Sequence, residues 1–511
     1  MKYEMLKSSV KVTELIEIKS TDMTGAEAAM LATLQGLISN KTEKRIFINC
    51  MRTDWSLEDL IENHGIKVRQ ESNVWNIVQE YKEYIKGYVL YNGDCSDYNP
   101  DAKLVYNKDA DESINVANTV APFYEAVIVD QSIEEQVKKL GIPMLMDVSN
   151  KTSEWAFDNY WDRVNHDIVA EIFPQLKMFL RDYAYMTKSF VFHKVPQEGG
   201  FREKILSHMN TNGALIGWSH SITKRGELDY ISEASKYGIA TIPSDWSPNI
   251  SVFSSFPEYK SGQHKRNVVE NEKGVHYVTI LMSDGDNEQW VFNDLLTSRK
   301  WFGNEYKGQF DVAFAMPPYL YDHAPTLLEK MYKMAGNTDK GQEQFIVGPS
   351  GLAYMYPSLY PEDKLDAHVM LLNDYMAKTD THVVAIIDDG ALDKKEIWDK
   401  YTAQSEIKGL FYLEYFVHST HKGKMYFSNE KPVVSCADML WVDLTDDDEV
   451  VERVNKGSVN VEEPEAYSMI YVHAWSKNMD DVAKMVSKFD EHVRVVNAEQ
   501  FMDLITKNVK K

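Results

Sequence analysis

Short apolar segments rich in β-branched and aromatic residues alternate with helix-forming segments along the chain. In the first half this pattern predicts strands over residues 45–50, 87–91, 125–130, 143–148, 189–195, 214–218 and 240–244. Helices are predicted between them, over residues 25–38, 133–140, 168–178 and 227–236. Strands that alternate with helices are typical of mostly parallel sheets. Residues 1–260 are therefore predicted to form an N-terminal α/β region, which is long enough for more than one subdomain.

A polar stretch over residues 256–274 is predicted to be a linker, and the alternation becomes sharper after it. Strands are predicted over residues 277–282, 311–316, 345–347, 382–387, 409–413, 432–435, 468–473 and 493–496. Helices are predicted over residues 326–334, 364–376, 394–401, 480–489 and 498–506. This order predicts a C-terminal (β/α) barrel-like domain over residues 270–511, incomplete where residues 413–432 lack a helical pattern. An open doubly wound sheet is the alternative.

Composition narrows the possible functions. The 511-residue chain carries a net charge of −23, which disfavours nucleic-acid binding because phosphates are repelled. We expect no membrane span, since no apolar run reaches about 18 residues.

The first residues lack a signal peptide, so we expect a cytoplasmic protein, or a secreted one if the sequence has been trimmed. Cys50, Cys95 and Cys436 are too few and too widely spaced for a disulfide framework, and we expect three reduced thiols.

Polar residues gather where predicted strands of the second half end. They are Asp284, Asp286 and Asn287; Ser350, Gly351, Tyr354 and Tyr356; Asp388 and Asp389; Glu414; and His473 and Trp475. In parallel α/β folds such strand ends converge on one rim, where active sites form. We therefore expect these side chains to share one site.

Each of these groups also has a purely structural interpretation. Asp284 and Asp286 have the spacing of an acid–base pair or of a cation site, but Asp286 or Asn287 could instead cap the next helix. Asp388 precedes an Asp-Gly pair that is common in turns. Glu414 lies among aromatic residues that would raise its pKa and suit a general acid, unless it points to solvent. No third ligand accompanies His418 and His421, so we predict no metal site.

Residues 351–357, Gly-Leu-Ala-Tyr-Met-Tyr-Pro, resemble the name-giving motif of the GxGYxYP family of putative glycoside hydrolases. The sequence departs from that motif at Ala353, where the family has its second glycine. Further matches are residues 283–287, 431–435 and 473–475, and residues 33–36 resemble the family's N-terminal region. The resemblance covers most of the chain and implies a hydrolase that acts on carbohydrate.

We therefore expect a glycoside hydrolase that needs no cofactor and acts on a carbohydrate or glycoconjugate. Asp284 and Asp286 are predicted as the primary acidic pair, with Glu414 or Asp388 as proton donor. Asn287, Ser350, Gly351, Tyr354, Tyr356, His473 and Trp475 are predicted to line the substrate site. One alternative is a metal-assisted carbohydrate deacetylase in which Asp284 or Asp286 binds a divalent ion together with His473. The other is a carbohydrate-binding protein without catalysis. The oligomeric state is not predicted.

Overall fold

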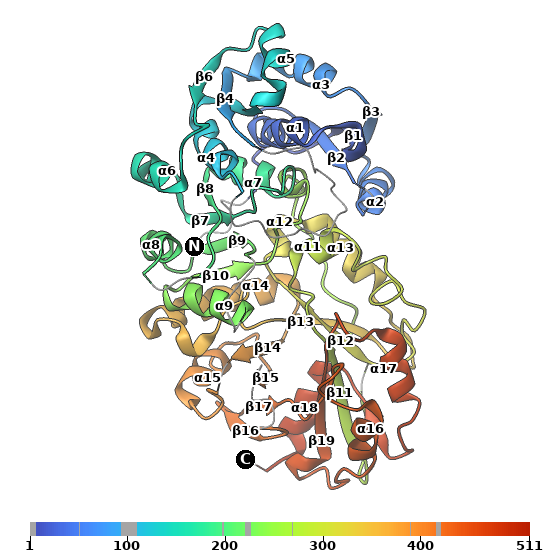
Figure 1. Ribbon diagram of the computed structural model, residues 1–511. Coiled ribbons are helices and arrows are strands. Elements are labelled where there is room, and N and C mark those ends of the chain that lie inside the picture. The colour runs from blue at the N-terminus through green and yellow to red at the C-terminus, as the bar shows by residue number, and fades with distance from the viewer. Residues whose placement is uncertain are drawn as a thin grey trace. The chain divides into compact units, whose positions relative to one another are not determined.

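The computed structural model describes residues 7–50, 52–93, 110–196, 199–219, 226–267, 269–388, 390–414 and 421–510. The chain divides into two compact units (Figure 1). The first comprises Met1–Tyr259, Glu288–Asp294 and Asp322–Leu327, and the second comprises Lys260–Asn287, Leu295–Tyr321 and Leu328–Lys511. No helix of the described residues is long and apolar enough to cross a membrane.

The first unit contains three parallel sheets, with strand orders β2-β1-β3, β5-β4-β6 and β10-β9-β7-β8. The strands are β1 (Glu14–Lys19), β2 (Lys44–Asn49), β3 (Lys67–Gln70), β4 (Gly87–Tyr91), β5 (Ala126–Asp130), β6 (Met144–Asp147), β7 (Asn165–Glu171), β8 (Ser189–Phe192), β9 (Ala214–Gly217) and β10 (Ala240–Ile242). The helices are α1 (Gly25–Ile38), α2 (Asp54–His64), α3 (Val74–Glu80), α4 (Ser113–Val120), α5 (Glu134–Lys139), α6 (Ser153–Tyr160), α7 (Arg181–Met186), α8 (Phe201–His208), α9 (Glu227–Lys236) and α10 (Ile250–Phe253). The predicted N-terminal α/β fold is confirmed.

Every residue of helix α1 except Glu27 is buried, which explains why its sequence is mostly apolar. Thr24 and Glu27 form a capping box that begins it, since each side chain bonds the other residue's backbone amide. Near its end, Gly36 lies so close to α7 that a Cβ atom would come within 2.5 Å of the Asp182 carbonyl oxygen. Gln35 donates to the Ile46 carbonyl at 3.0 Å and so ties the helix to β2.

The second unit is built on one 10-stranded sheet. Nine of its strands follow the order β16-β17-β15-β14-β13-β12-β11-β19-β18, and the tenth, β20, pairs with β11. The strands are β11 (His276–Met282), β12 (Val312–Met316), β13 (Glu343–Val347), β14 (Val383–Asp388), β15 (Gly409–Glu414), β16 (Met425–Ser428), β17 (Lys431–Ser435), β18 (Asp438–Leu440), β19 (Tyr467–Val472) and β20 (Val493–Val495). Helix α11 (Glu288–Phe292) belongs to the first unit, and α12 (Leu320–His323) and α13 (Pro325–Met334) are divided between the two units. The helices of the second unit are α14 (Glu362–Thr379), α15 (Lys395–Thr402), α16 (Asp447–Asn455), α17 (Met479–Val486) and α18 (Ala498–Asn508).

The large sheet curls around α18, which contacts both β11 and β17 although these strands lie far apart in the strand order (Figure 1). Phe501 of α18 packs against Phe411 and Tyr467, with ring centroids 6.0 and 5.7 Å away. The opposite face is covered by other helices; for example, the Trp398 ring of α15 lies 5.3 Å from that of Tyr412. The sheet is therefore a half-barrel, which confirms the predicted incomplete (β/α) barrel.

One local prediction needs correction. Residues 168–178 were predicted to be a helix, but their first part belongs to strand β7, buried between β8 and β9. Ile168, Val169 and Ala170 are all almost fully buried, and tertiary burial on both faces outweighs their helix-like spacing. The gap after β15 is filled in part by an antiparallel hairpin of β16 and β17 rather than by a helix. Residues 415–420 lie outside the described residues.

Candidate functional site

The chain makes a tight turn directly after β11, and this turn presents Asp284. The Asp284 backbone has a φ of 64°, which is uncommon outside glycine. At Gly285 a Cβ atom would come within 1.7 Å of the Ala315 carbonyl oxygen, so only glycine fits where the turn presses against β12. The Asn287 amide donates to the Asp284 carbonyl at 3.0 Å and closes the turn, whereas Asp286 is buried. Asn287 thus shapes the turn that holds Asp284.

The Asp284 carboxylate connects β11 to the end of β19. Trp475 donates its indole N–H to Asp284 Oδ1 at 2.8 Å, and the Ser283 hydroxyl donates to Oδ2. Ser283 Oγ also accepts the Ala474 amide at 3.1 Å. Burial raises the pKa of Asp284, while Ser283, His473 and Trp475 act to lower it. The site therefore holds a carboxyl group that keeps its proton to a higher pH than an ordinary aspartate.

His473 lies beside this carboxyl group and is fixed by an aromatic stack. Its ring is parallel to that of Trp441, with centroids 3.8 Å apart and planes 4° apart. Nδ1 of His473 is hydrogen-bonded to Ser476 Oγ at 2.8 Å. Burial lowers the pKa of His473, and the nearby Asp284 charge acts to raise it. Asp284 and His473 are thus titratable neighbours at the ends of adjacent strands.

Two tryptophans and a serine of this site were not predicted from the sequence. Trp441 follows the three-residue strand β18, and the Leu440–Val472 register places it beside His473. Trp301 donates to the Ala474 carbonyl at 2.8 Å and lies edge-on to Trp475, with centroids 6.1 Å apart. Ser283 belongs to the motif at residues 283–287, but the sequence predicts no role for its hydroxyl group. Trp441 could have been predicted as a site residue because it directly follows a strand. That strand, β18, is too short for its alternating pattern to be recognised in the sequence.

The GxGYxYP-like loop follows β13 and packs into the interior of the second unit. Ser350 bridges to β14, since its hydroxyl donates to the Ile387 carbonyl at 2.9 Å. Gly351 leaves room for His368, whose Nε2 would lie 2.3 Å from a Cβ atom at that position. Tyr354 and Tyr356 are buried, with their hydroxyl oxygens 3.3 Å apart. Their assignment to the substrate site remains a prediction.

Asp388 and Glu414 end the paired strands β14 and β15 and are directly opposite one another. Asp388 is fully buried and accepts hydrogen bonds from the Ser358 amide at 2.8 Å and hydroxyl at 2.5 Å. Glu414 Oε1 is hydrogen-bonded to His421 Nδ1 at 2.6 Å, and Oε2 is buried without a partner among the described residues. Asp389 lies outside the described residues. The catalytic roles of Asp388 and Glu414 remain predictions.

Strand alternation separates these carboxylates from His473. Side chains on paired parallel strands share a face when they stand in register or two residues apart. Glu414 shares its face with Tyr412, which packs against α15, whereas His473 continues the face of Tyr467, which packs against α18. The contacts above therefore bring Asp284, Asn287, His473 and Trp475 together, while those of Asp388 and Glu414 run to Ser358 and His421.

No group of three or more His, Cys, Asp or Glu side chains is arranged to hold an ion among the described residues. His421 bonds Glu414 and Asp393 instead, and His418 lies outside the described residues. Cys50 and Cys436 are buried, and Cys95 also lies outside the described residues.

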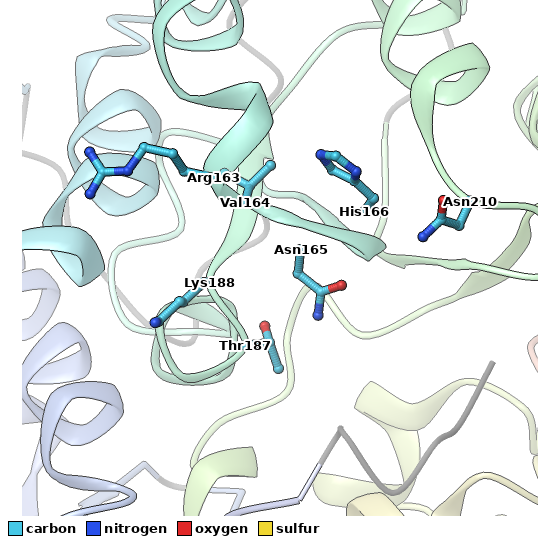
Figure 2. A pocket seen from close by; sticks show the side chains of 7 residues that line it. All are labelled: Arg163, Val164, Asn165, His166, Thr187, Lys188 and Asn210. Carbon is cyan, nitrogen blue, oxygen red and sulfur yellow. The ribbon is translucent and has the colours of Figure 1, made fainter.

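A separate pocket of about 380 Å³ lies in the first unit, at the start of β7 (Figure 2). Arg163 and Lys188 extend away from His166 rather than toward a common point (Figure 2). The Arg163 guanidinium lies 4.4 Å over the Phe123 ring, so this charge is already partnered. This pocket lies at the amino end of the strand, whereas ligands of α/β sheets bind at the carboxyl ends.

Comparison with known proteins agrees with this architecture. Four models of one family match in order: the GxGYxYP_N first domain (residues 14–83), the second domain (85–164), the third domain (166–255) and the "GxGYxYP putative glycoside hydrolase C-terminal domain" (274–506). A crystal structure described as "a putative hydrolase from Bacteroides thetaiotaomicron" is 29% identical, with a TM-score of 0.87 over 98% of this chain and 96% of that one. No curated protein matches the chain. The chain belongs to the GxGYxYP family.

Proposed function

We propose that the protein is a glycoside hydrolase in which Asp284 is the acid that protonates the leaving group. The observation that carries this proposal is the Asp284 carboxyl group itself. Burial raises its pKa, it accepts the Trp475 indole N–H at 2.8 Å, and it lies beside His473. A sugar alkoxide is a poor leaving group, so rapid cleavage of a glycosidic bond needs a proton on the departing oxygen from an acid that is still protonated at working pH.

The proposed reaction uses groups already in place and needs no cofactor. Asp284 gives its proton to the glycosidic oxygen as the bond to the anomeric carbon breaks, and water adds to that carbon. The carboxylate left behind is stabilised by the hydrogen bonds from Trp475 and Ser283. The Trp475 side chain is 52% exposed and offers an aromatic face on which a sugar ring can stack. The proton that the added water releases returns to the Asp284 carboxylate and restores the acid, because Asp388 and Glu414 lie on the other face of the sheet.

The test is turnover of a panel of glycosides by the wild type and by Asp284→Asn. Removing the acid should lower turnover by roughly a hundredfold or more. Asp490→Asn is the matched control, because Asp490 is an exposed aspartate of the same unit and precedes β20, which pairs with the beginning of β11, whereas Asp284 follows the end of β11 and has a φ of 64°. Asparagine tolerates this backbone conformation, so neither variant should unfold. Full activity of Asp284→Asn would disprove the assigned role.

The same panel distinguishes the two alternatives. Binding of glycans without turnover would identify a carbohydrate-binding protein. Release of acetate from acetylated sugars, lost with a chelator and restored by a divalent ion, would identify the metal-assisted deacetylase.

A further inference from the structure

An exposed apolar surface adjoins the Asp284 site. Three large apolar side chains there are 46%, 49% and 52% exposed: Val442, Leu444 and Trp475. Such side chains are normally scattered singly over a protein surface, and a group of them marks a place where something apolar binds. We call these three residues the apolar surface.

Hydrogen bonds hold the apolar surface against the proposed acid. The Val442 amide donates to Ser476 Oγ at 3.3 Å, and this same oxygen is bonded to His473 Nδ1 at 2.8 Å. The Leu444 amide donates to the Trp441 carbonyl at 3.2 Å and closes the turn that carries Val442. Trp475 completes the connection, since its indole N–H reaches Asp284.

The kinds of side chain suggest what binds there. Tryptophan stacks on sugar rings, but valine and leucine have neither a flat face nor a hydrogen-bonding group with which to recognise hydroxyls. They gain free energy by covering hydrocarbon. The one charged residue of the turn, Asp443, is acidic, and the chain carries a net charge of −23, which disfavours an anionic substituent.

We propose that the Val442 and Leu444 part of the apolar surface binds an uncharged hydrophobic aglycone, so that the substrates are glycosides of neutral apolar alcohols. This inference rests on the proposed function, because it assigns the aglycone side of the same site. The sugar would meet Trp475 and Asp284, and the departing alcohol would lie over Val442 and Leu444.

The test compares octyl and methyl glycosides of the same sugar, below the micelle concentration. β-Glucosides, β-galactosides and α-mannosides serve as probes, and dissociation constants are measured by calorimetry. The two alcohols have similar leaving-group chemistry, so a difference between them reports contact with the chain. We expect the octyl glycoside to bind roughly tenfold more tightly, which corresponds to partial burial of a few methylene groups.

The variant Val442→Ser/Leu444→Ser should abolish most of this preference and leave methyl glycoside binding unchanged. Val459→Ser is the matched control, since Val459 is 42% exposed in the same unit and should not alter the preference. An octyl-to-methyl ratio near one, or a ratio unchanged in the double variant, would overturn the inference. If the octyl-to-methyl binding ratio is near one but both glycosides are hydrolysed equally well, the inference is refuted and the proposed function is still supported. A preference lost in the double variant, without any turnover, would instead support the surface and refute the hydrolase.

Discussion

The hydrogen bond from Trp475 to Asp284 sets the pH range in which the proposed acid works. Replacing Trp475 with phenylalanine removes the indole N–H but keeps an aromatic ring. That N–H bonds Asp284 Oδ1 at 2.8 Å and favours the charged carboxylate, so its loss should raise the pKa of Asp284 further. A hydrogen bond to a charged group contributes about 1.5–3 kcal/mol, and one pKa unit corresponds to about 1.4 kcal/mol. Because Trp475 is 52% exposed, solvent weakens the effect, and we expect a rise of roughly one unit.

The assay is the pH dependence of kcat/KM for Trp475→Phe and wild type. A general acid must be protonated, so activity falls as pH rises through its pKa, and the alkaline limb should move upward by roughly one pH unit. Trp155→Phe is the control, since Trp155 is a half-buried tryptophan of the first unit. Carbon NMR of the labelled carboxyl group would follow the same shift without substrate. An alkaline limb that stays in place or moves downward would refute the assignment of Asp284.

Three further predictions concern stability. Burial raises the pKa of Asp284, so ionisation of this carboxyl group destabilises the fold as pH rises. The Tm of Asp284→Asn, measured by calorimetry, should therefore equal that of the wild type in acid and exceed it in mildly alkaline solution. Gly351→Ala should lower the free energy of unfolding, measured by urea denaturation, by roughly 1–3 kcal/mol, because the added methyl group would meet His368 Nε2 at 2.3 Å. The control Ala353→Gly should change this free energy by less than about 1 kcal/mol. Asp388→Asn should cost roughly 1–3 kcal/mol in the same measurement, because one of the two buried oxygens that accept hydrogen bonds from Ser358 is replaced by an amide nitrogen, which cannot accept one. An unchanged free energy of unfolding would contradict this anchoring role.

Sequence patterns predicted the alternating elements better than the side chains that complete the site. The polar turn at Asp284 and the His473–Trp475 pair were found because both follow long apolar strands that pair in register. Trp441 was missed because β18 has three residues, too few for a periodic signal. Residues 168–178 were assigned to a helix because apolar residues recur there at helical spacing, and only the sheet that surrounds β7 decides otherwise. The sequence also could not predict that Tyr354 and Tyr356 are buried, because aromatic residues are common both in protein cores and in sugar-binding sites.

A position at the end of a strand does not by itself deliver a side chain to a site. Asp388 and Glu414 are still in strand register, so the pleat commits both to the face that α15 covers. Asp284 lies two residues beyond the end of β11, where a φ of 64° and the close approach of Gly285 to Ala315 turn the chain out of register. It can therefore meet Trp475 and His473, which follow the neighbouring strand β19. The glycine that permits this turn places the acid, and we accordingly assign the protonation step to Asp284 rather than to the more deeply buried carboxylates.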